Sequence, residues 1–272
     1  MASLTHTARR TAGRARHSTA LEVLTRAGFV GYGLLHLAVA WLALQIALGH
    51  SGVEGDQSGA FRVLLRQPLG RPLLIAIAAG LVAMAVWQLL EAALGHREER
   101  HRAFERLVSL ARTVIYSALA WTAWNVQAGA PTSSAGQQQH ATAGVLAHPS
   151  GRLLVVIAGL VVIAVGIGMF VYGAKRMFEK RLRIAQMSHR TRRTAIRLGQ
   201  VGYLAKGIAF GIAGILLFGA AVKKNAGQSN GLDGALRTLA GKPYGQLLLI
   251  AIAIGFAAFG VYCFFQSRYR KV

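Results

Sequence analysis

The chain has 272 residues, of which 54% are hydrophobic and 15% are charged, and its formal net charge is +22. A soluble domain usually carries about a quarter charged residues, so this composition speaks against an ordinary soluble protein. The single cysteine, Cys263, excludes an internal disulfide framework and a cysteine-rich metal site. A large basic excess fits nucleic-acid binding, an anionic membrane surface or the basic inner loops of a membrane protein, and long apolar runs favour the last.

Residues 1–25 are polar and basic and predict a cytoplasmic tail. The next run, Ala27–Leu48, is long enough to cross a bilayer, which needs about 20 residues. Five further runs follow: Leu73–Leu94, Leu107–Ala128, Leu153–Tyr172, Leu198–Val222 and Leu247–Phe265. Only helices or closed barrels satisfy their backbone in lipid, and these runs lack the alternation of barrel strands. We therefore expect an all-α polytopic membrane protein with six transmembrane helices.

A Pro-x-Gly motif precedes the second, fourth and sixth runs, at Pro68, Pro149 and Pro243. Proline is well placed in the first turn of a helix, so the motif predicts three equivalent helix starts. We expect three tandem helix hairpins. Such repeats all enter the membrane in one direction, so they can form a pseudo-threefold ring; a staggered row of hairpins is the alternative. The predicted repeats span 26–95, 106–178 and 197–272.

The connections between the runs differ in character. Polar hinges at 55–59 and 227–231 precede short apolar stretches, which predict short helices at the outer interface. The equivalent middle segment, Thr132–Gln139, is of low complexity and predicts disorder. The segment 179–196 predicts a basic cytoplasmic loop, either for nucleic-acid or phosphoinositide-like recognition or, more simply, for topology and attraction to anionic lipid. Because Lys and Arg concentrate on one side, both termini are predicted to be cytoplasmic.

The first helices of the repeats share a second pattern, Gly-aromatic-x-Ala-Lys-Gly. It is clearest at 202–207, recognisable at 28–33, and has lost its glycines at 108–113. Together with Pro-x-Gly-x-Leu, this pattern resembles a bacterial membrane family known as domain of unknown function 1206, common in actinobacteria. The resemblance extends from about Arg26 to the C-terminus. It implies tandem two-helix units with basic inner loops, and it implies no catalytic residue.

Ionisable residues inside apolar runs are informative, because charges there are costly and usually paired or functional. Glu91, Arg112 and Lys206 fall in such runs. Alignment of the repeats places Tyr32 at the position of Arg112 and Lys206, with His36 one turn deeper. We predict that these five residues form a buried polar cluster near the cytoplasmic helix ends, with Glu91 paired to one of the cations. The alternative is that both cations snorkel to the headgroups.

Motifs for chemistry are missing from the sequence: it has no nucleotide-binding glycine loop, no His-Glu-x-x-His and no cysteine pair. Bis-histidine haem ligation would need a second histidine at the depth of His36, and none is present. We therefore expect no cofactor, no metal and no catalytic residue. A lipid-directed enzyme with Glu91 or His36 as its base would lack a carboxylate pair or triad.

We expect a non-enzymatic scaffold or accessory subunit of a complex in the cell (inner) membrane. A transporter or channel for a small solute or lipid is the alternative, supported by the tandem repeat and the buried charges. The expected partners are membrane lipids, with anionic headgroups at the cytoplasmic face, and other membrane proteins. Specific nucleic-acid binding is not expected, because the positive charge is spread over every inner segment.

Overall fold

The computed structural model describes residues 19–50, 52, 54–94, 102–130 and 132–270. Within these ranges the regular secondary structure is helical, apart from one isolated bridge between Leu182 and Arg270. The predicted all-α class is therefore confirmed. Six helices are long: α2 (Thr19–Ala47), α4 (Gly70–Leu94), α5 (Arg102–Gln127), α7 (Gly151–Ala174), α8 (His189–Val222) and α10 (Gly245–Tyr269).

Five of the long helices, α2, α4, α7, α8 and α10, are long and apolar enough to cross a membrane. The exception, α5, carries Glu105, Arg106 and Arg112 in its first half and Asn125 near its end. The described part of the chain thus has the helices of a membrane protein, whereas the predicted count of six spans is not confirmed.

Three short helices connect the two long helices of each repeat: α3 (Gln57–Leu65), α6 (Ser134–Leu146) and α9 (Gly231–Ala240). Helices were predicted after the first and third hinges, but the prediction of disorder at Thr132–Gln139 is wrong. Ser133 caps α6 by accepting a hydrogen bond from the Gly136 N–H at 2.8 Å, and Ala135 is buried. Capping and packing thus outweigh the low-complexity composition.

The Pro-x-Gly motif forms a tight corner between a short helix and the long helix after it. The long helix begins at the glycine of the motif in all three repeats, at Gly70, Gly151 and Gly245. An added Cβ would lie 2.0, 1.6 and 2.1 Å from a carbonyl oxygen of the preceding short helix, that of Leu64, Val145 and Leu239 respectively. The corner therefore requires glycine, and the proline lies in the turn before the helix instead of in its first turn.

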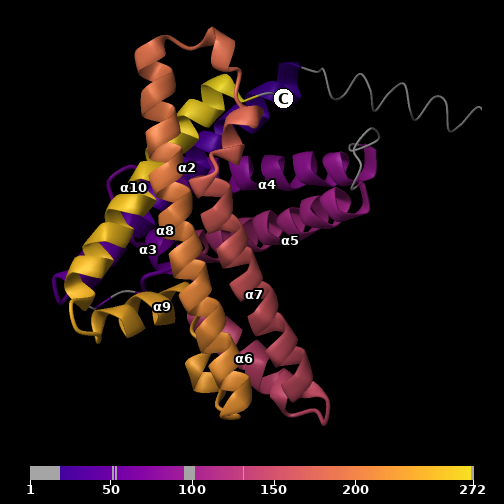
Figure 1. Ribbon diagram of the computed structural model, residues 1–272, viewed down its shortest axis with the longest axis vertical. Helices are drawn as coiled ribbons and strands as arrows, with labels where there is room; N and C mark the ends of the chain where they lie inside the picture. Colours follow the sequence, from indigo (N-terminus) through magenta and orange to yellow (C-terminus); the bar gives the residue numbers. More distant parts are fainter. Residues whose placement is uncertain (1–18, 51, 53, 95–101, 131, 271–272) are drawn as a thin grey trace, which may run out of the picture.

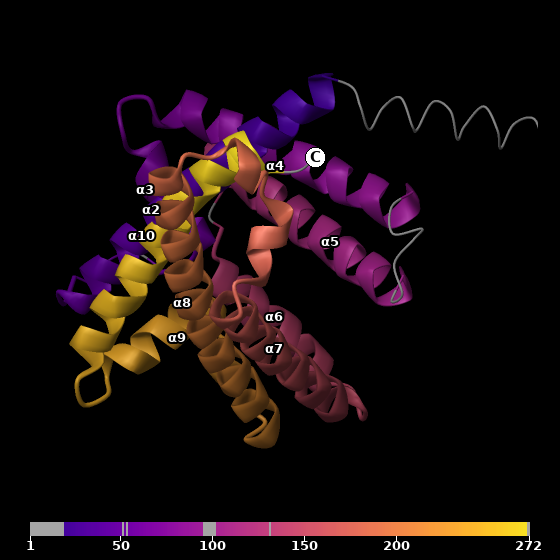
Figure 2. The ribbon, with the colours of Figure 1, turned by 45° about the horizontal axis from the view of Figure 1, so that its top comes forward.

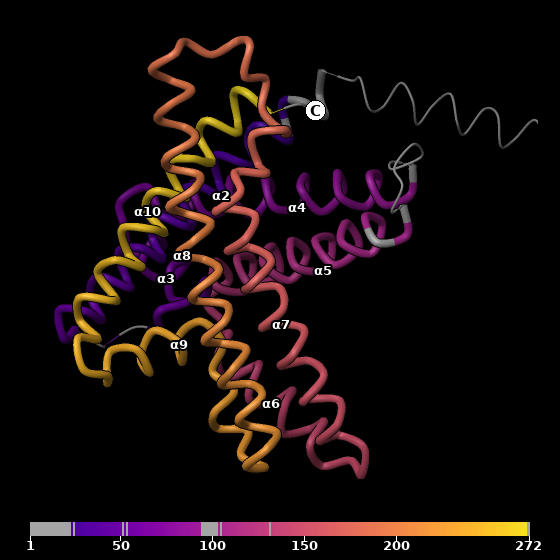
Figure 3. Tube along the Cα trace, viewed as in Figure 1, coloured from indigo at the N-terminus to yellow at the C-terminus, as the bar shows by residue number. Residues whose placement is uncertain are grey.

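The long helices pack as three pairs, α4 with α5, α7 with α8, and α10 with α2. Figure 1 shows the α4–α5 pair running toward the right and the α7–α8 pair toward the bottom, and the turned view of Figure 2 keeps the partners side by side. Each pair joins the second long helix of one repeat to the first of another, as the trace in Figure 3 shows. The repeats are therefore interlocked, and the third repeat closes onto the first.

Glycines allow close approach within these pairs. A Cβ at Gly166 of α7 would lie 2.6 Å from the backbone nitrogen of Gly211 on α8, and one at Gly33 of α2 would lie 2.8 Å from the carbonyl oxygen of Gly260 on α10. Small residues at helix crossings let backbones touch in lipid, where no hydrophobic force drives helices together.

Part of the predicted basic loop 179–196 is folded. The 3₁₀ turn η1 (Met177–Arg181) runs into it, η2 (Ile184–Gln186) lies inside it, and α8 begins already at His189. Phe178 and Leu182 are buried, and the Arg183 N–H donates to the Tyr269 carbonyl at 2.7 Å. This segment is therefore fixed against the end of α10.

Candidate functional site

A buried lysine, Lys206 of α8, forms the centre of the candidate site. Only 5% of Lys206 is exposed. Its Nζ atom lies 3.1 Å from the Tyr32 hydroxyl and 3.1 Å from His36 Nε2, both on α2. The same Nζ atom lies 3.9 Å from the ring centroid of Phe259 on α10. Helices from the first and third repeats therefore meet around one amino group.

The hydrogen bonds assign the tautomer of His36. Its Nδ1 atom lies 2.8 Å from the Tyr32 carbonyl oxygen, which can only accept, so Nδ1 carries the proton. Nε2 then offers its lone pair to Lys206. An ammonium has three N–H donors, so Lys206 has two neutral oxygen or nitrogen acceptors and the π face of Phe259. The site can thus hold one positive charge among neutral groups.

Lys206 and His36 are two basic groups in one hydrogen bond. Two unit charges about 3 Å apart repel by about 5 kcal/mol even at an effective dielectric constant of about 20. The pair therefore carries at most one positive charge, and the proton between Nζ and Nε2 can shift from one nitrogen to the other without changing the total charge. Among the described residues, no carboxylate hydrogen-bonds to either group.

The cluster lies deeper than the sequence predicts. His36 is halfway along the candidate span Thr25–Ala47, about 16 Å from either end at the rise of an α-helix. Since the Lys206 amino group contacts His36, it lies beside the middle of the candidate span of α2 instead of extending alone toward a helix end. The alternative in which Lys206 snorkels to the surface is therefore wrong.

Tyr116 was not among the predicted site residues but packs against the cluster, and the two remaining predicted residues, Arg112 and Glu91, lie further from its centre. The ring of Tyr116 on α5 packs edge-on against Tyr32, with centroids 5.8 Å apart. Half-buried Arg112 is within electrostatic range of both tyrosine hydroxyls. Glu91, in the last turn of α4, has an interaction partner, but the ion pairs between described residues do not join it to Lys206 or Arg112. The structure thus brings together Tyr32, His36 and Lys206, without the expected ion pair.

A second polar cluster joins the connections between the long helices. Hydrogen bonds link the first repeat to the second and the third, and the second to the third. They are Ser133 Oγ to Glu54 Oε1 at 2.5 Å, the Gly55 N–H to Asp233 Oδ1 at 2.7 Å, Thr142 Oγ1 with Ser229 Oγ at 2.8 Å, and the Gln139 amide to Asn230. This cluster was not predicted from the sequence, although polar N-cap residues in the hinges were a usable signal.

Asp56, beside this cluster, is the N-cap residue of α3 and is buried, with 2% of the residue exposed. Its carboxylate accepts hydrogen bonds from the Gly59 N–H at 3.0 Å and from the Ser58 hydroxyl at 2.7 Å. Burial raises the pKa of the Asp56 carboxyl above its usual value, and the nearby carboxylates of Glu54 and Asp233 add to the rise against the two hydrogen bonds.

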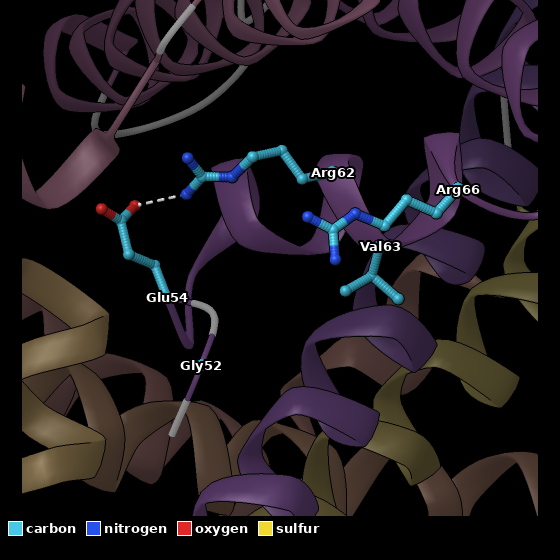
Figure 4. A pocket seen from close by; sticks show the side chains of 5 residues that line it. All are labelled: Gly52, Glu54, Arg62, Val63 and Arg66. Carbon is cyan, nitrogen blue, oxygen red and sulfur yellow. Dashed lines mark hydrogen bonds and ion pairs between the residues drawn. The ribbon is translucent and has the colours of Figure 1, made fainter. Parts of the chain in front are cut away.

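Two surface pockets lie at opposite ends of the helices. The first, of about 240 Å³, adjoins α3 and is lined by Gly52, Glu54, Arg62, Val63 and Arg66. Figure 4 shows the Arg62 guanidinium directed at Glu54, and the two are 3.0 Å apart. The second, of about 290 Å³, lies at the start of α8 and is lined by Arg176, His189, Arg192, Arg193, Ile196 and Arg197. Within the described ranges, no three His, Cys, Asp or Glu side chains are grouped to hold a metal ion.

Comparison with known proteins places the chain in a family. It is 29% identical over 250 residues to a protein of Bacillus subtilis (strain 168) described as "Uncharacterized protein YxxB", covering 91% of this chain and 90% of that protein. No solved structure matches. The family described as Domain of Unknown Function (DUF1206) matches residues 27–95, 107–176 and 201–270, one match in each predicted repeat. The chain therefore belongs to the DUF1206 family and carries three copies of its domain.

Proposed function

We propose that this protein is a non-enzymatic, multi-pass protein of the cell membrane that binds and releases a proton at the Lys206–His36 pair and thereby moves protons, or a small solute with them, across the membrane. One observation carries this proposal: the Lys206 amino group is buried at mid-span and hydrogen-bonded to a neutral histidine. Ionisable residues at that depth are costly, and in membrane proteins they mark ion paths and proton relays.

The pairing of two basic nitrogens favours proton handling over a purely structural bond. A helix-anchoring contact could be made by neutral side chains at lower cost. His36 has a fixed tautomer, and its Nε2 lone pair accepts the hydrogen bond from Lys206. Such a pair can take a proton at one nitrogen and pass it on at the other.

We also propose that α5 is the sixth span and that the repeats surround a pseudo-threefold axis. α5 packs along α4, a candidate span, and returns toward the short helix α6. The hydrogen bonds among the connections link every repeat to both others. The contacts of Tyr32 with Lys206 and Tyr116 bring the first long helices of all three repeats to one point. The bias of Lys and Arg supports cytoplasmic termini.

A scaffold role is the second candidate. Trp121 and Trp124 on α5 are 65% and 58% exposed, and large apolar side chains cover the outer face of α7. These faces suit lipid or a membrane partner equally. A scaffold would have no evident use for a basic pair at mid-span, so the transport role ranks first, whereas the sequence alone favoured the scaffold.

Proton flux into proteoliposomes tests the proposal. The purified protein would be reconstituted with a pH-sensitive dye inside, and a potassium diffusion potential would drive protons inward. The wild type and Lys206→Met would be compared with Lys223→Met, which removes an exposed lysine at the end of the same helix. We expect flux from the wild type and the control and none from Lys206→Met. Equal flux from all three proteins, or none from the wild type, would refute the proposal.

A further inference from the structure

The pocket at the start of α8 has a regular construction. His189, Arg192, Arg193, Ile196 and Arg197 follow the spacing that places residues on one face of a helix. The remaining lining residue, Arg176, comes from the turn between α7 and η1. Five of the six lining residues are thus basic or titratable to a cation, and the described lining includes no acidic side chain.

Arg176 is linked to α8 by a hydrogen bond. Its backbone adopts the left-handed conformation, with φ of 52°, directly after the α7 helix. Its Nε–H donates to Gln200 Oε1 at 3.2 Å, one turn beyond the arginine stripe on α8. This hydrogen bond ties Arg176 to α8, so the pocket is built from the first turns of α8 and from the turn that follows α7.

The surroundings of the pocket select its ligand. Four guanidinium groups around about 290 Å³ repel one another unless an anion lies between them. The start of a long helix adds partial positive charge. The apolar part of α8 begins at Leu198, directly beside the pocket, and half-buried Ile196 adds an apolar contact. A ligand here can place an anionic head among the arginines and an apolar part along the helices.

We propose that this pocket binds a phosphate ester, with the headgroup of an anionic phospholipid as the source that its place beside the apolar helix favours. Guanidinium groups match phosphate oxygens with two parallel hydrogen bonds, which an ammonium cannot do. The site is separate from the Lys206 cluster, so the proposal for it does not depend on the transport proposal.

Native mass spectrometry of the full-length protein in detergent tests this site with phosphatidylglycerol as the probe. The variant Arg192→Gln/Arg193→Gln removes two pocket charges. The control Lys175→Gln/Arg190→Gln removes two charges at the same end from exposed residues outside the pocket lining. We expect at least a tenfold loss of affinity in the pocket variant, since each lost charge-assisted hydrogen bond costs about one order of magnitude, and less than about twofold in the control.

Further arms distinguish the ligand source and the role of geometry. Arg192→Lys/Arg193→Lys keeps the charge but loses the paired hydrogen bonds, so it should bind with intermediate affinity. Competition by glycerol phosphate or inorganic phosphate would assign a soluble phosphate compound as the ligand, and failure to compete would assign the lipid; both support phosphate chemistry. Equal loss in the pocket and control variants, or no phosphatidylglycerol binding by the wild type, would overturn the proposal.

Discussion

Replacing Lys206 by methionine removes the charge and leaves an unbranched side chain that is one atom shorter. Two hydrogen bonds from a charged donor are lost, worth about 1.5–3 kcal/mol each, with a cation–π contact of about 2 kcal/mol. In return, the desolvation cost of an ammonium disappears, which is several kcal/mol in a protein interior. We therefore expect Lys206→Met to change the free energy of unfolding by no more than about 2 kcal/mol.

The partner variant should behave differently. His36→Leu leaves the Lys206 charge buried with one acceptor fewer, so it should cost more than Lys206→Met, and the double variant should recover part of the loss. Tryptophan fluorescence during denaturant unfolding in one detergent provides the assay, since the chain has four tryptophans. A loss above about 4 kcal/mol for Lys206→Met, or a milder effect for His36→Leu, would show that the lysine is a net stabilising anchor and would refute this reasoning.

Three further predictions concern packing, pH and topology. Gly166→Ala should lower the free energy of unfolding by about 1–3 kcal/mol, because its Cβ would meet the α8 backbone. Gly168→Ala on the same helix should cost nothing, because its Cβ meets no atom within 4 Å. Thermal melting in detergent compares the two variants, and equal losses of stability would contradict the packing. The raised pKa of Asp56 means that its stabilising contribution is present below the unfolded pKa of about 3.9 and is lost as pH rises through the folded-state pKa. Asp56→Asn should therefore weaken the pH dependence of the melting temperature over this range. If the parent protein instead gained stability relative to the variant as the pH rises, the predicted direction would be wrong. Single cysteines at the exposed positions Ala147 and Thr194, in a cysteine-free background, should label from opposite sides of the membrane; labelling of both from one side would contradict the topology.

Periodicity and repeats in the sequence predict the long helices, the three units and the all-α class, because a membrane leaves few other solutions for long apolar runs. The helix α6 was missed because its stability comes from the Ser133 cap and from burial against other repeats, neither of which composition reveals. The arginine face at 189–197 was readable from its spacing, but the high charge suggested a loop.

The repeat alignment places Tyr32 and Lys206 at equivalent positions, and the structure brings them into contact. The alignment says nothing of which way a long side chain points. Lys206 turns inward because α2 offers it two neutral acceptors, a hydroxyl and a histidine nitrogen with a fixed lone pair. Such partners depend on how α2 and α8 meet through α10, which no local pattern encodes.

The interlocked order of the helix pairs has a consequence for biogenesis. The α4–α5 and α7–α8 pairs join helices that are neighbours in the chain, so they can form while the chain is still being inserted. The α10–α2 pair must wait for the last helix, which also brings Phe259 to the lysine. Until then, the Lys206 amino group lacks its contact with the Phe259 ring. We expect this exposed charge to mark an unfinished molecule, so that membrane proteases can distinguish it from the closed one.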